Sequence, residues 1–183
     1  TLAGVTFAYV GDAAHPCNSL STTLTKLGLN VRVGNAAGYE MAPELQKLAA
    51  QFAAESGGSF LLTNDPLEAV AGADFVYTDC WWWTGQEDEY KDRVEAFKPF
   101  QVNPDLWSHA KPETKFMHCL PAMRGEEVVD EIADGPMSII FPQAQNRMHF
   151  QKALMLALIG IDELPADPDL QPIRNDPRFV AAL

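Results

Sequence analysis

Short apolar runs alternate with longer amphipathic stretches along the chain. The first run, residues 5–10, is rich in β-branched and aromatic residues and stops at Gly11-Asp12, which predicts a buried strand that reaches a loop. Comparable runs predict strands at residues 30–33, 59–63, 75–78, 114–117 and 138–141. Such strands, separated by helices, favour a mostly parallel sheet.

The amphipathic stretches carry apolar residues at helical spacing. One helix is expected from the capping residue Asn18 onwards. Others are predicted at residues 42–55, 66–70, 87–97, 104–110, 126–132 and 146–159. The chain is therefore predicted to be an α/β protein, a three-layer Rossmann-like domain with a mostly parallel sheet flanked by helices.

Composition narrows the classes of protein. The 183 residues are 47% hydrophobic, enough for one substantial core. The formal net charge of -12 argues against nucleic acid or an anionic membrane as a partner, since both require clustered Lys and Arg. No apolar stretch approaches the roughly 20 residues that span a bilayer, and the chain does not begin with a signal-peptide pattern. We therefore expect a cytoplasmic protein.

The strand predicted at residues 114–117 is followed directly by His118-Cys119-Leu120-Pro121. Open α/β folds bind ligands at the carboxyl edge of the sheet, so this segment indicates a ligand site. A thiol hydrolase with Cys119 as nucleophile is one hypothesis, and a small buried cysteine is the bland alternative. Adjacent strand residues point to opposite faces, which makes His118 a poor base for Cys119. The three cysteines are widely spaced, which indicates reduced thiols.

Three of the four tryptophans follow the strand predicted at residues 75–78, in the segment Asp79-Cys80-Trp81-Trp82-Trp83-Thr84-Gly85. Three adjacent indoles cannot all point into one core, so at least one is expected to face a cleft or a neighbouring subunit. For any one of these tryptophans, an equally good alternative is that the indole only covers the apolar edge of the sheet. Asp79 is stronger evidence, because a carboxylate beside aromatic rings suits an ammonium-bearing ligand.

Two further segments are candidate ligand sites. Gly11-Asp12 lacks the spacing of a dinucleotide fingerprint, which argues against a nicotinamide enzyme, and His15-Pro16 fits either a ligand-facing loop or a helix-entry turn. Arg147 lies where the last helix is expected to begin. A guanidinium at a helix N-terminus suits an anion or a polarised carbonyl oxygen, although a surface arginine is the simpler explanation.

Taken together, these strand ends resemble the carboxyl-terminal, amine-binding domain of the aspartate/ornithine transcarbamylase family, from about residue 5 to residue 159. His118-Cys119-Leu120-Pro121 resembles the ornithine-type branch, and the segment Asn146-Arg147-Met148-His149 follows at the appropriate position. Within that branch, several short segments are most similar to putrescine carbamoyltransferase. Ornithine enzymes typically carry Ser-Met-Gly where this chain has Trp83-Thr84-Gly85, and indoles would fill the space of an α-carboxylate, whereas Met148-His149 is the ornithine form.

The resemblance implies transfer of the carbamoyl group of carbamoyl phosphate to a small amine or amino acid, without cofactor or metal. Putrescine is the expected acceptor, ornithine (giving citrulline) the alternative, and a non-catalytic amine-binding or scaffold module the alternative from another class. By resemblance, Asp79 and Cys119 orient the amine, and Arg147 and the backbone around Leu120 hold the carbamoyl oxygen. Substrate contacts are expected from the remaining candidate positions, His118, Pro121, His15, Trp83, Thr84 and Gly85.

The family's other half has no counterpart in this sequence. Its phosphate-binding Ser-Thr-Arg-Thr segment and its His-Pro-x-Gln motif are both missing, and the chain begins with Thr1, so we expect a part of something longer. Residues 1–161 are expected to form the ornithine- or putrescine-binding domain and residues 162–183 a tail that docks on an adjacent subunit. The complete enzyme is expected to be a homotrimer, with the fragment inactive alone.

Overall fold

The computed structural model describes residues 2–159. The chain divides into two compact units, one ending at Ile140 and one beginning at Phe141. The first unit contains the sheet and its covering helices, and the second begins with a long helix. The docking tail predicted at residues 162–183 lies outside the described residues.

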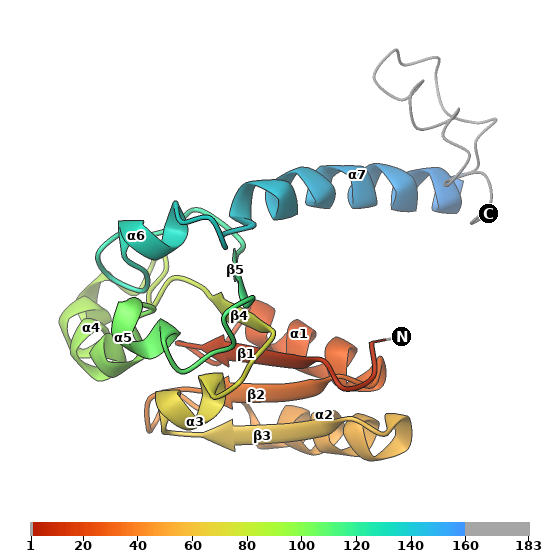
Figure 1. Cartoon of the computed structure of the whole chain (residues 1–183), viewed down its shortest axis with the longest axis horizontal. Coiled ribbons are helices and arrows are strands. Elements are labelled where there is room, and N and C mark those ends of the chain that lie inside the picture. Colours follow the sequence, from red (N-terminus) through yellow and green to blue (C-terminus); the bar gives the residue numbers. More distant parts are fainter. Residues whose placement is uncertain (1, 160–183) are drawn as a thin grey trace, which may run out of the picture. The chain divides into compact units, whose positions relative to one another are not determined.

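Five parallel strands form one sheet in the order β3-β2-β1-β4-β5 (Figure 1). Their bounds are β1 Thr6–Val10, β2 Asn30–Gly34, β3 Ser59–Thr63, β4 Phe75–Thr78 and β5 Lys115–His118. β1 lies at the centre between β2 and β4, so the strand order reverses beside it. Such a reversal leaves a crevice at the carboxyl ends of the two central strands.

Helices cover both faces of the sheet. The first unit contains α1 Pro16–Lys26, α2 Pro43–Ser56, α3 Pro66–Val70, α4 Tyr90–Phe97, α5 Pro104–Trp107, α6 Asp130–Ala133 and the short 3₁₀ turns η1 Glu87–Glu89 and η2 Lys98–Phe100. Proline occupies the first turn of α1, α2, α3 and α5, where its missing N–H costs nothing. Gly57 ends α2 at φ 82°, a left-handed conformation that favours glycine.

Alternate residues of β1 supply the two halves of the core. Phe7 and Tyr9 pack with the apolar side of α1, including Cys17. Ala8 and Val10 pack on the opposite face with residues of α3, α5 and α6. This alternation follows from the two-residue period of a strand, and it confirms the predicted three-layer α/β fold.

Several element boundaries differ from the sequence prediction. α1 begins at Pro16 rather than Asn18, since proline is pre-organised for a first helical position. The helices predicted at 104–110 and 126–132 are reduced to α5 and α6. The strand predicted at 138–141 is wrong: Ser138 makes only an isolated bridge with Phe116. The final helix, α7 Ile140–Ile159, begins six residues earlier than expected, and Pro142 is accommodated in its first turn.

Candidate functional site

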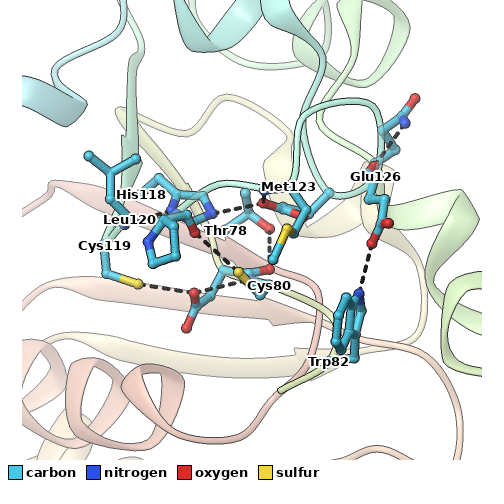
Figure 2. Close-up of polar contacts among 12 residues, drawn as sticks. Thr78, Cys80, Trp82, His118, Cys119, Leu120, Met123 and Glu126 are labelled. Atoms are coloured by element: carbon cyan, nitrogen blue, oxygen red, sulfur yellow. Dashed lines mark hydrogen bonds and ion pairs between the residues drawn. The ribbon is translucent and has the colours of Figure 1, made fainter. Parts of the chain in front are cut away.

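Three loops meet at the carboxyl ends of β1, β4 and β5. They contain residues 11–15, 79–86 and 119–129, which include most of the predicted site residues. β1 and β4 are paired, and so are β4 and β5, so the three loops emerge side by side from the sheet. Figure 2 shows the polar contacts between the second and third loops.

Asp79 and Cys119 are in direct contact. Asp79 Oδ1 accepts a hydrogen bond from Cys119 Sγ at 3.0 Å and another from the Cys80 backbone N–H at 2.8 Å (Figure 2). Asp79 is 2% exposed, and its Oδ2 has no hydrogen-bond partner among residues 2–159. A buried carboxylate oxygen without a partner is able to accept a proton or a hydrogen bond from a ligand.

The electrostatics of this pair favour a thiol beside a carboxylate. Burial raises the pKa of the Asp79 carboxyl, and the hydrogen bonds from Cys119 and the Cys80 N–H partly offset the increase. Burial, followed by the contact with Asp79, raises the pKa of the Cys119 thiol to about 12. Thiolate, not thiol, is the nucleophile, so this environment suits an orienting donor better than the nucleophile of a hydrolase.

His118 points away from Cys119 into a closed network. Its Nδ1 accepts a hydrogen bond from the Leu120 N–H at 2.8 Å, which leaves the ring proton on Nε2, 3.1 Å from Glu127 Oε1. The same oxygen accepts from the Met123 N–H at 2.6 Å. Both side chains, His118 and Glu127, are 0% exposed. His118 therefore supports the loop backbone through its contacts with Leu120 and Glu127, and its predicted contact with substrate stays a prediction.

Leu120 and Pro121 are placed by that network. Leu120 has φ 60°, a left-handed conformation that costs free energy for a residue with a branched side chain. The hydrogen bond from its N–H to His118 holds it there. The Pro121 carbonyl accepts from Cys80 Sγ at 3.1 Å and so joins the loop after β5 to the loop after β4.

Arg93 was missed by the sequence reasoning. From α4 its Nη1 donates to Asp12 Oδ2 at 2.9 Å and to the Trp81 carbonyl at 3.1 Å, so it joins the loops after β1 and β4. Burial raises the pKa of Asp12, and the Arg93 guanidinium opposes that increase. The sequence offered one weak signal, the Glu89-Arg93 pair at helical spacing, which forms an ion pair at 2.8 Å.

His15 and Trp83 form the outer wall of the loops. Their ring centroids are 4.6 Å apart, and His15 adopts φ 44°, an unfavourable conformation for histidine. His15 is exposed and Trp83 is half-buried, with its Nε1 buried and without a hydrogen-bond partner among residues 2–159. Thr84 and Gly85 lie exposed beyond them, where the Gly85 N–H donates to Glu87 Oε2 at 2.9 Å.

A family model described as the Asp/Orn binding domain of aspartate/ornithine carbamoyltransferase matches residues 3–158. The chain belongs to this family. The chain is 53% identical over 157 residues to the ornithine carbamoyltransferase of Thermococcus kodakarensis, a match that covers 86% of this chain and 50% of the relative. It therefore spans about half the length of the curated relatives it matches.

Solved structures agree with the carbamoyltransferase fold. The ornithine carbamoyltransferase of Pyrococcus furiosus superposes with a TM-score of 0.82 at 52% identity, over 85% of this chain and 50% of that one. An N-acetyl-L-ornithine transcarbamylase superposes with a TM-score of 0.74 at 32% identity, over 86% and 50%. The relatives compared here are named for ornithine or its N-acetyl form, so they favour the ornithine alternative, and the predicted closeness to putrescine enzymes is unconfirmed.

Arg147, the remaining catalytic candidate, lies exposed on α7 in the second unit. Because α7 begins at Ile140, Arg147 is inside the helix, and the predicted helix N-terminus at this position is wrong. Its role toward a carbamoyl oxygen stays a prediction.

Two groups of side chains in the candidate site have metal-ligand chemistry. Asp79, His118 and Cys119 form one, and Cys80, His118 and Glu127 the other, with ligand atoms within 4.8 Å of one another. His118 is shared, and its two nitrogens already contact Leu120 and Glu127. A metal ion in either group would have to displace those contacts. Separately, no helix within residues 2–159 has the length and apolar character needed to cross a membrane.

Proposed function

We propose that this chain is the amine-binding domain of a carbamoyltransferase whose acceptor is ornithine. The observation that carries the proposal is the contact between Asp79 and Cys119 at the carboxyl edge of the sheet, beside the point where the strand order reverses. The names of the relatives support ornithine as the amine and citrulline as the product. Putrescine is the second candidate, because Trp83 and His15 form an aromatic wall that suits an acceptor without an α-carboxylate.

The geometry suggests how the amine is prepared. An alkyl ammonium ion, with a pKa near ~10.4, must lose a proton before its nitrogen can attack. The Asp79 carboxylate is suited to draw the ammonium ion into the site, and its unpartnered Oδ2 is suited to accept that proton, since burial has already raised its pKa. Cys119 holds the other oxygen, Oδ1, and so fixes the direction in which Oδ2 points.

The neutral nitrogen then attacks the carbamoyl carbon of carbamoyl phosphate. A new C–N bond forms, the bond from that carbon to the phosphate oxygen breaks, and the second amine proton leaves with the phosphate. The carbamoyl oxygen is negative in the transition state, and each well-placed donor to it stabilises that charge by ~3 to 4 kcal/mol. Arg147 is the proposed donor, since the Leu120 N–H already donates to His118 Nδ1.

The phosphate contacts are proposed to come from the half of the relatives that this chain does not match. An acidic chain with a net charge of -12 is a poor phosphate site, which supports a division of labour between two domains. We further propose that the complete subunit assembles as a homotrimer, with residues 162–183 against a neighbour, and that this domain alone binds amine without turning it over.

Steady-state kinetics of the complete enzyme with carbamoyl phosphate and three acceptors would test the proposal. Ornithine is expected to give the highest kcat/KM, above N-acetylornithine and putrescine. A higher kcat/KM for putrescine than for ornithine would mean that the aromatic wall of His15 and Trp83 selects a diamine, and would overturn the proposal that ornithine is the acceptor. Calorimetric binding of an amine without turnover by the complete enzyme would instead identify a non-catalytic binding module.

A further inference from the structure

The three consecutive tryptophans contact three different parts of the molecule. Trp81 is 2% exposed and stacks on Phe97 of α4, with ring centroids 6.0 Å apart. Trp82 Nε1 donates a hydrogen bond to Glu126 Oε2 at 3.0 Å (Figure 2). The third indole packs against the loop after β1, as described above. The loop after β4 is thereby attached to a helix and to both neighbouring loops.

Of the three, only Trp82 joins the loop that carries Asp79 to the loop that carries Cys119. We propose that Trp82 is a positioning residue: its hydrogen bond to Glu126 keeps the loop after β4 against the loop after β5, and so keeps Asp79 against Cys119. This inference rests on the proposed function for its consequence in catalysis. Its consequence for the Cys119 thiol, which is how readily the thiol reacts with an alkylating agent, does not depend on what the enzyme catalyses.

Glu126 is itself held firmly. Its second oxygen, Oε1, accepts from the Tyr90 hydroxyl at 3.0 Å, and the Tyr90 ring meets the Trp82 ring edge to face, at 5.3 Å and 83°. Gln101 Nε2 donates to the backbone carbonyls of Glu126 at 2.8 Å and Gly125 at 2.9 Å. Both carboxylate oxygens and the backbone are therefore engaged, so Trp82 donates to a fixed acceptor rather than to a mobile surface carboxylate.

The loops need such a contact because the strand ladder has ended. The last paired residues of β4 and β5 are Thr78 and His118. Asp79 and Cys119 lie directly beyond this last pair. Past that point the contacts between the two loops include Cys119 with Asp79, Cys80 with the Pro121 carbonyl, and Trp82 with Glu126. A hydrogen bond to a charged group is about twice as strong as one between neutral groups, so the Trp82 contact is a substantial part of this set.

Two variants of the complete enzyme remove the contact with little change of shape. Trp82→Phe keeps an aromatic ring beside Tyr90 and removes the donor, and Glu126→Met keeps a side chain of similar length and removes both acceptor oxygens. Each is expected to raise the KM for the acceptor amine by about 10-fold and to lower kcat, because Asp79 also takes the amine's proton, with the KM for carbamoyl phosphate nearly unchanged. The double variant is expected to be no worse than either single one, because both remove the same contact.

Tyr90→Phe is the matched control. It removes a hydrogen bond to the same carboxylate but leaves the contact between the two loops intact, so the acceptor KM is expected to change less than about 2-fold. The second readout is the rate at which iodoacetamide alkylates Cys119, followed by peptide mass spectrometry. This rate is expected to rise several-fold in Trp82→Phe and Glu126→Met and to stay unchanged in Tyr90→Phe.

The outcomes separate the two proposals. An unchanged KM and an unchanged alkylation rate in a folded Trp82→Phe protein would overturn the positioning role, as would equal effects in Tyr90→Phe. If Trp82→Phe fails to fold, Glu126→Met decides alone. Faster alkylation of Cys119 in the variants, together with a wild-type enzyme that carbamoylates no amine, would support the positioning role and reject the proposed function.

Discussion

His118 and Cys119 are neighbours in the chain, but each faces a different carboxylate on a different side of the sheet edge. The pair of His118 and Glu127 is wholly buried, and two backbone N–H groups complete its network. The pair of Asp79 and Cys119 is half-open, since Cys119 is partly exposed. Because successive side chains of a strand point to opposite faces, His118 supports the loop while its neighbour Cys119 is placed to act as a donor toward a ligand.

The two carboxylates also share a feature. Within the part of the chain that the structure describes, Asp79 Oδ2 and Glu127 Oε2 are both buried without a hydrogen-bond partner. Only the first adjoins a partly exposed thiol. Exposure to solvent, rather than the number of hydrogen bonds, therefore distinguishes the proposed catalytic pair, Asp79 and Cys119, from the supporting pair, His118 and Glu127. Variants of the first pair should mainly change activity, and variants of the second should mainly change stability.

The largest expected effect is on activity, from Asp79→Asn. The amide keeps an Oδ1 acceptor for Cys119 but cannot take a proton from the amine, so kcat/KM for the acceptor should fall by about 10²- to 10⁴-fold. Its free energy of unfolding at neutral pH should stay within about 1 kcal/mol of wild type or rise, because the variant no longer buries a charge. Steady-state rates and urea unfolding measure the two properties.

The stability difference between wild type and Asp79→Asn is expected to depend on pH, in a direction set by the pKa of Asp79. Burial raises the folded-state pKa of Asp79 above its unfolded value, so the buried charge destabilises the wild type at neutral pH. That loss disappears as pH falls through the folded pKa and is absent below the unfolded value, near ~3.9. Wild type should therefore gain stability relative to Asp79→Asn on acidification, and a gain on raising the pH would contradict the assignment.

The next largest effect is on stability, from the supporting pair. Glu127→Ala leaves the His118 Nε2–H and the Met123 N–H buried without their acceptor and should lower the free energy of unfolding by about 3–5 kcal/mol. Glu127→Gln keeps an oxygen for both donors and should cost much less. Urea unfolding of both variants tests this, and equal losses would show that charge, not the acceptor, matters.

Cys119→Ala should have an intermediate effect on activity. Asp79 Oδ1 keeps the Cys80 N–H as a donor, so the carboxylate loses one of its two hydrogen bonds. Removing a hydrogen bond to a charged group costs about 1.5–3 kcal/mol, which corresponds to a loss of about 10- to 100-fold in kcat/KM. Cys119→Ser should retain most of the rate, because a hydroxyl also donates. A serine variant as poor as alanine would indicate a covalent role for the thiol.

Part of this site was predictable from the sequence, for a simple reason. Apolar runs located β3 and β4 at the bounds the structure gives, and parallel strands place their carboxyl ends at one edge of the sheet. The resemblance to the transcarbamylase family then implied that Asp79 and Cys119 act together. The roles of Arg93 and Glu127 were not predicted, because Arg93 reaches the loops from α4 and Glu127 meets His118 across the loop after β5, and both contacts depend on tertiary packing. The start of α7 was misplaced because residues 138–141 were predicted to be a strand, whereas the helix begins at Ile140 and accommodates Pro142 in its first turn.

The smallest effect is expected from an exposed cluster close to the supporting pair. Arg124 contacts Asp130 at 2.7 Å and Asp134 at 2.6 Å, and all three side chains face solvent. Exposed ion pairs are screened by water and salt, and ordering long side chains opposes their attraction. Arg124→Ala should therefore leave both the melting temperature and the acceptor KM unchanged at moderate ionic strength. A measurable loss of activity without a change in melting temperature would mean that Arg124 attracts or contacts substrate, and that the functional surface extends beyond the half-open pair.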